Sequence, residues 1–248
     1  MCTVVLHRRP GHDWPLIIAA NRDEMKTRLS RPPGRHWPDR PEVRAGLDVL
    51  AGGSWMGVND WGVTAAILNR ENTLGPEMGK RSRGELVLDA LDHPDAFIAA
   101  QAFADLNPDA YRPFNMIIAD SDDAYWVVHR GDRIRIETIR DGLSMITARD
   151  LNDMSSPRLQ RFLPLFSQAA VPDPDKGDWS DWQMLMASPG ADGEEVFGGM
   201  CFSAENGFGT VSSSLLALPS VDLMASVKPV YLHADGPPDN AEWAAVED

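Results

Sequence analysis

The start of the chain carries the feature that most restricts its fold: an apolar run that follows a cysteine directly. Cys2 precedes Thr3-Val4-Val5-Leu6, and β-branched residues in such a run favour a strand. Cysteine is small enough for methionine aminopeptidase to remove Met1, which would leave residue 2 with a free α-amine. One residue would then hold a nucleophilic thiol and a base with a pKa of about 7.7–8.0. We therefore expect Cys2 to be a catalytic nucleophile. The alternative is a small residue without a role.

A second apolar run follows after a turn at residues 10–13. Residues 14–20 are apolar and typical of a buried strand, and they end in Asn21-Arg22-Asp23-Glu24. We expect a hairpin that brings this tetrad of amide, guanidinium and carboxylate groups back beside the chain start. The alternative is a polar loop with a surface ion pair between Arg22 and Asp23, which stabilises a protein little.

Length and charge restrict the class of protein. The chain has 248 residues, and no Gly/Ser linker or charge block divides it, so we expect a single domain over residues 1–248. The net charge of −14 argues against nucleic acid and anionic membranes as partners. No apolar run is long enough to span a bilayer, and His7-Arg8-Arg9 interrupts any signal-peptide core. We expect a cytoplasmic protein.

The cysteines and histidines predict neither a cofactor nor a metal. Two cysteines, Cys2 and Cys201, make no disulfide framework, and Cys201 is expected to be a buried apolar residue. The six histidines show no spacing typical of a haem or metal site. His7 and His129 fall in expected strands, where histidines are mostly core or surface residues.

The order of expected elements predicts the fold class. Strands come first, then a pair of helices, four strands, a second pair of helices and closing strands. Two antiparallel sheets with helices outside account for this order, because strands and helices do not alternate as in a doubly wound parallel fold. Residues 25–48 are rich in Pro, Arg and Gly, and predict a long surface loop. The later elements are expected at 51–59, 63–68, 86–91, 94–103, 114–120, 124–129, 134–139, 142–147, 155–168, 178–186, 210–218 and 227–232.

In combination, several short motifs resemble those of the NRDE family, also called the transport-and-Golgi-organisation 2 family. These are Met1-Cys2-Thr3, the tetrad at 21–24, Gly-Gly-Ser-Trp at 52–55, Asn-x-x-Gly at 59–62 and Gly-Thr-x-Ser-Ser at 209–213. That family in turn resembles N-terminal-nucleophile hydrolases of the choloylglycine hydrolase and penicillin V acylase type. The resemblance implies an α+β fold, a four-layer αββα sandwich of two antiparallel sheets. It also implies cleavage of a non-peptide amide bond in a small molecule.

The same resemblance implies the site residues Cys2, Asn21, Asp23 and Asn69, to which Arg22 is added as a substitute for the arginine that these hydrolases place before the tetrad. Cys2 would attack the amide carbonyl, and Asp23, in the Asn-x-Asp pattern, would align the amine or the thiol. Arg22 would lower the thiol pKa or bind a substrate carboxylate. Asn69, which closes the second hairpin, would stabilise the oxyanion. The arginine that these hydrolases place before the tetrad falls on Ala20 here.

The resemblance also leaves a second function open. Eukaryotic relatives have been linked to haem trafficking and lipid homeostasis, which suggests a non-catalytic carrier of haem or of an acyl ligand on the same fold. A purely structural interaction module is the third alternative. The expected partner is therefore a small-molecule amide or another hydrophobic ligand.

Overall fold

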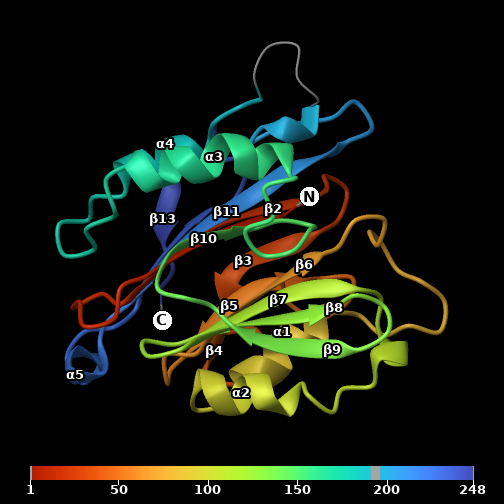
Figure 1. Cartoon of the computed structure of the whole chain (residues 1–248), viewed down its shortest axis with the longest axis horizontal. Helices are drawn as coiled ribbons and strands as arrows, with labels where there is room; N and C mark the ends of the chain where they lie inside the picture. The colour runs from red at the N-terminus through yellow and green to blue at the C-terminus, as the bar shows by residue number, and fades with distance from the viewer. Residues whose placement is uncertain (1, 191–195, 248) are drawn as a thin grey trace. The chain divides into compact units, whose positions relative to one another are not determined.

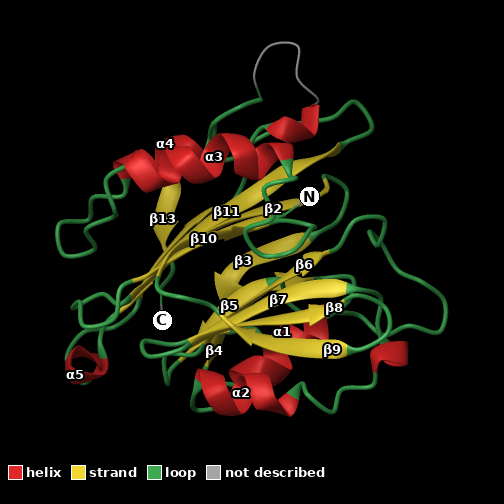
Figure 2. Cartoon of the chain, in the orientation of Figure 1, coloured by secondary structure: helices red, strands yellow, loops and turns green. Residues whose placement is uncertain are grey.

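The computed structural model describes residues 2–190 and 196–247, which form two compact units (Figure 1). Of the described residues, the first unit takes 2–27, 141–190 and 196–246, and the second takes 28–140 and 247. Each unit contains one antiparallel sheet and helices (Figure 2). The expected pair of antiparallel sheets is confirmed, while the single domain over residues 1–248 stays a prediction.

The sheet of the first unit joins the beginning and the end of the chain. Its strand order is β10-β1-β2-β11-β12-β13. The predicted first hairpin is confirmed, because Thr3 pairs with Asn21 and Arg8 pairs with Leu16. The tetrad therefore ends its strand beside the chain start. The strands are β1 (Thr3–Arg8), β2 (Leu16–Met25), β10 (Gly142–Ile146), β11 (Phe208–Leu218), β12 (Val230–Ala234) and β13 (Trp243–Ala245).

Helices of the first unit cover one face of this sheet, which we call the helix face. They are α3 (Pro157–Gln168) and α4 (Ser180–Met186), and the unit also contains the short α5 (Val221–Met224) and the turn η2 (Val196–Gly198). Proline suits the first position of α3, since the amide hydrogen it lacks has no partner there. Phe162 and Phe166 of α3 are buried in one core with Val5, Ile17 and Ala19 of the sheet. Because side chains alternate along a strand, these three residues define the helix face.

The sheet of the second unit has the strand order β3-β4-β5-β6-β7-β8-β9. Leu86 and Leu91 of the first helix share a core with Phe114 and Met116 of β7. The strands are β3 (Ser30–Gly34), β4 (Val43–Asp48), β5 (Met56–Asn59), β6 (Thr64–Asn69), β7 (Phe114–Ala119), β8 (Ala124–His129) and β9 (Ile134–Thr138). The helices are α1 (Gly84–Leu91), α2 (Ala96–Ala102) and the turn η1 (Pro108–Ala110).

The predicted loop over residues 25–48 is wrong, since the segment contains the whole of β3 and of β4. The strand β3 lies at the edge of its sheet, where a proline removes no hydrogen bond to a second neighbour. The register shifts between Arg31 and Gly34, around the two prolines. In β4, Val43 and Ala45 alternate as fully buried residues. The prolines and the glycine of β3 argue against a central strand, but they are compatible with a strand at the edge of the sheet.

The Asn-x-x-Gly motif has a structural explanation. Asn59 is fully buried, and its Nδ2 donates to the carbonyls of Leu91 and His93 at 2.9 and 2.8 Å. Its Oδ1 accepts from the main-chain amides of Trp61 and Val63 at 3.1 and 2.9 Å. One side chain thus joins the β5–β6 turn to the carboxyl end of α1.

The Gly-Gly-Ser-Trp motif is explained by a close approach of two backbones. A Cβ added to Gly53 would lie 2.5 Å from the carbonyl carbon of Gly84 and 2.8 Å from the amide nitrogen of Glu85, at the start of α1. The amide of Ser54 donates to the carbonyl of Gly84 at 2.9 Å. The rotation of a neighbouring side chain cannot relieve this clash, because the atoms that a Cβ of residue 53 would meet belong to the main chain.

We expect Gly53→Ala to lower the free energy of unfolding by about 2–3 kcal/mol, because α1 must shift away from the added methyl group. Urea denaturation measures the change. Gly34→Ala is the matched control, because a Cβ there meets only the side chain of His36, at 3.4 Å. That variant should stay within about 0.5 kcal/mol of the parent. Equal midpoints for both variants would contradict the packing argument.

Candidate functional site

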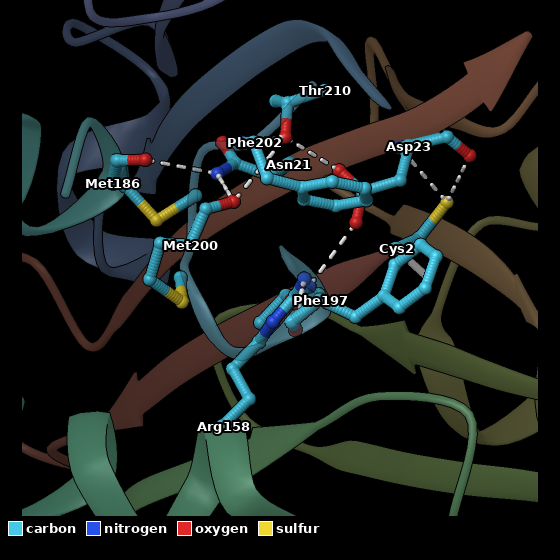
Figure 3. Close-up of polar contacts among 10 residues, drawn as sticks. Cys2, Asn21, Asp23, Arg158, Met186, Phe197, Met200, Phe202 and Thr210 are labelled. Atoms are coloured by element: carbon cyan, nitrogen blue, oxygen red, sulfur yellow. Dashed lines mark hydrogen bonds and ion pairs between the residues drawn. The ribbon is translucent and has the colours of Figure 1, made fainter. Parts of the chain in front are cut away.

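The thiol of Cys2 lies against the main chain of Asp23. Because β1 begins at Thr3, opposite Asn21, the main-chain groups of Asp23 lie beyond the last pair of the β1–β2 ladder. The amide of Asp23 donates to Cys2 Sγ at 3.3 Å, and Sγ is 3.5 Å from the carbonyl oxygen of Asp23 (Figure 3). Cys2 is half-buried. The thiol is therefore fixed at the end of β2 and retains access to solvent.

The carboxylate of Asp23 is buried and bound through both oxygens. Oδ1 accepts from Thr210 Oγ1 at 2.8 Å, and Oδ2 lies 3.1 Å from Arg158 Nη1 (Figure 3). Thr210 lies directly opposite Asp23 in the β2–β11 pair. Arg158, from the first turn of α3, also donates from Nη1 to Thr3 Oγ1 at 2.7 Å and from Nη2 to the carbonyl of Phe197 at 3.0 Å. These contacts lie on the helix face.

The pleat of β2 divides the tetrad between two faces of the sheet. Asn21 Nδ2 donates to the carbonyls of Met186 and Met200 at 3.0 and 2.9 Å, on the helix face with Asp23. Successive side chains alternate, so Arg22 lies on the opposite face, where Ser212 is its neighbour in β11. The tetrad thus returns beside the chain start, as predicted, but its amide and its guanidinium do not share a surface.

Electrostatics keep the Cys2 thiol protonated at neutral pH. Burial first, and then the negative charge of Asp23, raise the pKa of Cys2 above its ordinary value. The hydrogen bond from the Asp23 amide and the positive charge of Arg22 lower the pKa by smaller amounts. Arg22 therefore acts in the direction that the sequence predicts, but other effects outweigh it.

On the face that carries Arg22, His233 and Ser214 form a buried pair across β11 and β12. Nδ1 of His233 lies 3.0 Å from Ser214 Oγ. Burial lowers the pKa of His233 to about 4, and the charge of Arg22 adds to this effect while Asp235 opposes it. The unfolded histidine takes up a proton near pH 6.5, so between pH 6.5 and 4 the unfolded state binds more protons. Stability from this residue is present above pH 6.5 and is lost as the pH falls.

We expect acidification from pH 7 to pH 4 to remove up to about 3 kcal/mol of stability through His233. The variant His233→Gln cannot take up this proton, and its free energy of unfolding should decline less over the same range. Urea denaturation of both proteins at several pH values measures the difference, so that the contribution of the carboxylates cancels. Parallel pH profiles would contradict the assignment.

Asn69 lies in the second unit. It is the last residue of β6, opposite Phe114 of β7. The role of Asn69 in oxyanion stabilisation stays a prediction.

Two further residues of the site were missed by sequence reasoning. Thr210 and Arg158 lie 187 and 135 residues from Asp23. Thr210 had a signal, since it belongs to the Gly-Thr-x-Ser-Ser motif. Its neighbour Gly209 is required because an added Cβ would lie 2.6 Å from the carbonyl oxygen of Phe202. For Arg158 the sequence offers no signal beyond its place after Pro157, at the start of a helix.

The remaining cysteine and the histidines considered above lie apart from this chemistry. Cys201 is buried, and its Sγ is 3.4 Å from Asp239 Oδ1. Burial and Asp239 raise the pKa of Cys201 to about 12, which makes it an unreactive thiol. His129 is buried against the ring of Phe114, and His7 is half-buried.

Two kinds of feature are not found among residues 2–190 and 196–247. No helix there has the length and apolar composition needed to cross a bilayer. Within the same ranges, no group of three or more His, Cys, Asp or Glu side chains is placed to hold a metal ion.

Comparison with known families explains why these motifs occur together. The family described as Transport and Golgi organisation 2 matches the chain over residues 1–176. The chain belongs to this family. The resemblance inferred from the tetrad and its companion motifs is thereby confirmed. Comparison with curated proteins finds no significant match.

Solved structures that resemble this family member share its fold at low sequence identity. The N-acylethanolamine-hydrolyzing acid amidase ortholog of Caenorhabditis elegans is 12% identical, with a TM-score of 0.60 over 99% of this chain and 100% of that chain. Two variants of the conjugated bile acid hydrolase from Clostridium perfringens are 10% and 12% identical. Their TM-scores are 0.52 and 0.55, over 100% of this chain and 97% of theirs. The predicted α+β fold of the N-terminal-nucleophile hydrolases is confirmed.

Proposed function

We propose that this member of the Transport and Golgi organisation 2 family is an N-terminal-cysteine amidohydrolase that cleaves an amide bond in a small molecule. The observation that carries the proposal is the placement of Cys2 Sγ, 3.3 Å from the amide nitrogen and 3.5 Å from the carbonyl oxygen of Asp23. A half-buried thiol at a fixed position can meet a substrate carbonyl in one geometry, which favours attack. The structural neighbours named above are hydrolases by their titles, which supports the same chemistry.

The proposed reaction uses two groups of one residue. Removal of Met1 exposes the α-amine of Cys2, which takes the thiol proton as Sγ bonds to the amide carbonyl carbon. The tetrahedral intermediate collapses, the C–N bond breaks, and the ammonium returns its proton to the leaving amine. Water then attacks the thioester with the amine as base, and releases the acid and the thiol. The raised pKa of Cys2 fits this order, because proton removal accompanies attack.

The remaining site residues have supporting roles. The amide of Asp23 donates to the sulfur and stabilises the thiolate that forms. Asn21 uses both amide hydrogens to tie β2 to the segments at Met186 and Met200, which keeps the end of β2 in place. Arg22 contributes positive charge near the thiol.

The proposal is tested by the state of the amino terminus. Intact-mass spectrometry of protein from a cytosolic host should give the mass of the chain without Met1. The same preparation is incubated with a panel of N-acyl amides, and released acid is measured by mass spectrometry. A variant with a lysine inserted between Met1 and Cys2 keeps its methionine, because the aminopeptidase requires a small second residue. This variant should be inactive although its thiol is intact. Full activity with Met1 retained would refute the proposal.

A further inference from the structure

We infer that Arg158 is a positioning residue of the proposed thiol site. Arg158 holds Asp23 in place, so that the main chain of Asp23 faces Cys2 Sγ. The inference rests on the proposed function only for what the thiol does. The contacts of Arg158 lie on the helix face of the first unit. The experiment that tests the inference measures the reactivity of the thiol and does not require amide hydrolysis.

Asp23 is anchored through its side chain. Its two carboxylate oxygens are held from different elements, by Thr210 of β11 and by Arg158 of α3. The side chains of Asp23 and Arg158 are 0% and 4% exposed. A buried charge of this kind is stable only with a well-placed partner. With both oxygens fixed, Asp23 cannot rotate, and its amide and carbonyl stay aimed at the sulfur.

Arg158 also contacts Thr3, the first residue of β1. Nη1 donates at 2.7 Å to Thr3 Oγ1, in the residue directly after Cys2. The same guanidinium nitrogen is 3.1 Å from Asp23 Oδ2, in the residue that contacts Sγ. Arg158 therefore joins the two main-chain segments that meet at the thiol, and sets their separation.

The guanidinium of Arg158 is itself held in place. Nη2 donates to the carbonyl of Phe197 at 3.0 Å, and the guanidinium carbon lies 5.4 Å from the ring centroid of Phe202 (Figure 3). The rings of Phe197 and Phe202 contact each other at 5.3 Å. Lysine has no planar fork, so it cannot make the contacts to Asp23, Thr3 and Phe197 together.

The charge of Arg158 adds an electrostatic consequence. The carboxylate of Asp23 raises the pKa of Cys2, and the ion pair with Arg158 reduces its effective negative charge. The positive charge of Arg22, on the other face of the sheet, lowers the pKa of Cys2 and so counteracts the effect of this carboxylate. Loss of Arg158 should raise the thiol pKa further, and removal of both partners of the ion pair should reverse that rise.

The experiment follows the rate of alkylation of Cys2 by iodoacetamide between pH 6 and 10, in a Cys201→Ala background. Arg158→Met should slow alkylation at pH 7 by about tenfold, through a rise of about one unit in the pKa of Cys2. Arg158→Lys should give an intermediate rate. The double variant Arg158→Met/Asp23→Asn should return to within about threefold of the parent, because it removes both charges.

Arg161→Met is the matched control. It lies in the same helix, and its guanidinium stacks on Phe162 at 4.9 Å. It should leave the pH profile unchanged. If Arg158→Met fails to fold, the alkylation profiles of Arg158→Lys and of the isosteric Thr3→Val test the inference instead, since each variant removes only part of the contacts of Arg158. The inference is overturned if these variants keep the parental profile. If no amide is cleaved by the parent, the proposed function fails, whereas the alkylation result stands.

Discussion

Cys2→Ala is expected to lower kcat/KM on any N-acyl amide that the protein cleaves by at least about 10⁴-fold, because the atom that bonds to the substrate is removed. Residual rates of enzymes that lose their nucleophile come from binding and oxyanion stabilisation alone. Cys2→Ser should keep a small activity, since its oxygen can attack but is a weaker nucleophile. Steady-state assays with product detection by mass spectrometry measure both variants.

The fold provides the control for this prediction. Alanine at position 2 loses only the two sulfur contacts with Asp23, outside the β1–β2 ladder, so the melting temperature should change by less than about 2 °C. Unchanged turnover in Cys2→Ala would eliminate Cys2 as the nucleophile, whereas a parent protein that cleaves no amide would leave the non-catalytic carrier of haem or of an acyl ligand. An absorption titration with micromolar haem then tests that alternative, because a spectral shift is required for haem binding.

Asn59→Ala is expected to lower the free energy of unfolding by about 4 kcal/mol, the largest effect among the stability predictions. The substitution leaves the carbonyls of Leu91 and His93 and the amides of Trp61 and Val63 without their partner. Each polar group that is left unsatisfied in the interior costs about 1–3 kcal/mol, and water reaches some of them after relaxation. Chemical denaturation of the purified variant measures the loss.

Two comparisons separate this network from a general effect of removing an asparagine. Asn107→Ala removes one exposed contact, in which Oδ1 accepts from the amide of Asp109, and should cost less than about 1 kcal/mol. Asn59→Asp keeps both accepted bonds but places negative charge against two carbonyls, so it should be as damaging as alanine. A mild effect of Asn59→Ala would show that the β5–β6 turn is held by its main chain alone.

The first hairpin could be predicted because its information is local. The apolar runs at the start of β1 and in β2 are strand-like, a turn separates them, and the pairing of Thr3 with Asn21 follows from that turn. The position of the thiol beside the tetrad is therefore readable from about 25 residues. The same applies to the core face of α3, whose apolar positions recur with helical spacing.

The details of the site could not be predicted, because they depend on residues far apart in the sequence. The ion pair of Asp23 with Arg158 exists only because α3 lies across the sheet at the level of Thr3. The neighbours of Arg22 and Asp23 in β11 depend on the register of the β2–β11 pair, including its shift between Thr210 and Ser212. Edge position, which made β3 compatible with its prolines, is likewise a property of the sheet and not of the segment.

The sheet of the first unit also imposes a time order on the maturation of the protein. Asp23 and Thr210 are neighbours in that sheet although 187 residues separate them. At a synthesis rate of about 5–20 residues per second, the ribosome needs about 10–40 s to produce the strand that β2 requires. During this interval β2 is unpaired on the side that β11 later occupies, and the sheet that surrounds the amino terminus is incomplete. The removal of Met1 that the proposed mechanism requires therefore has an interval of this length before the sheet closes.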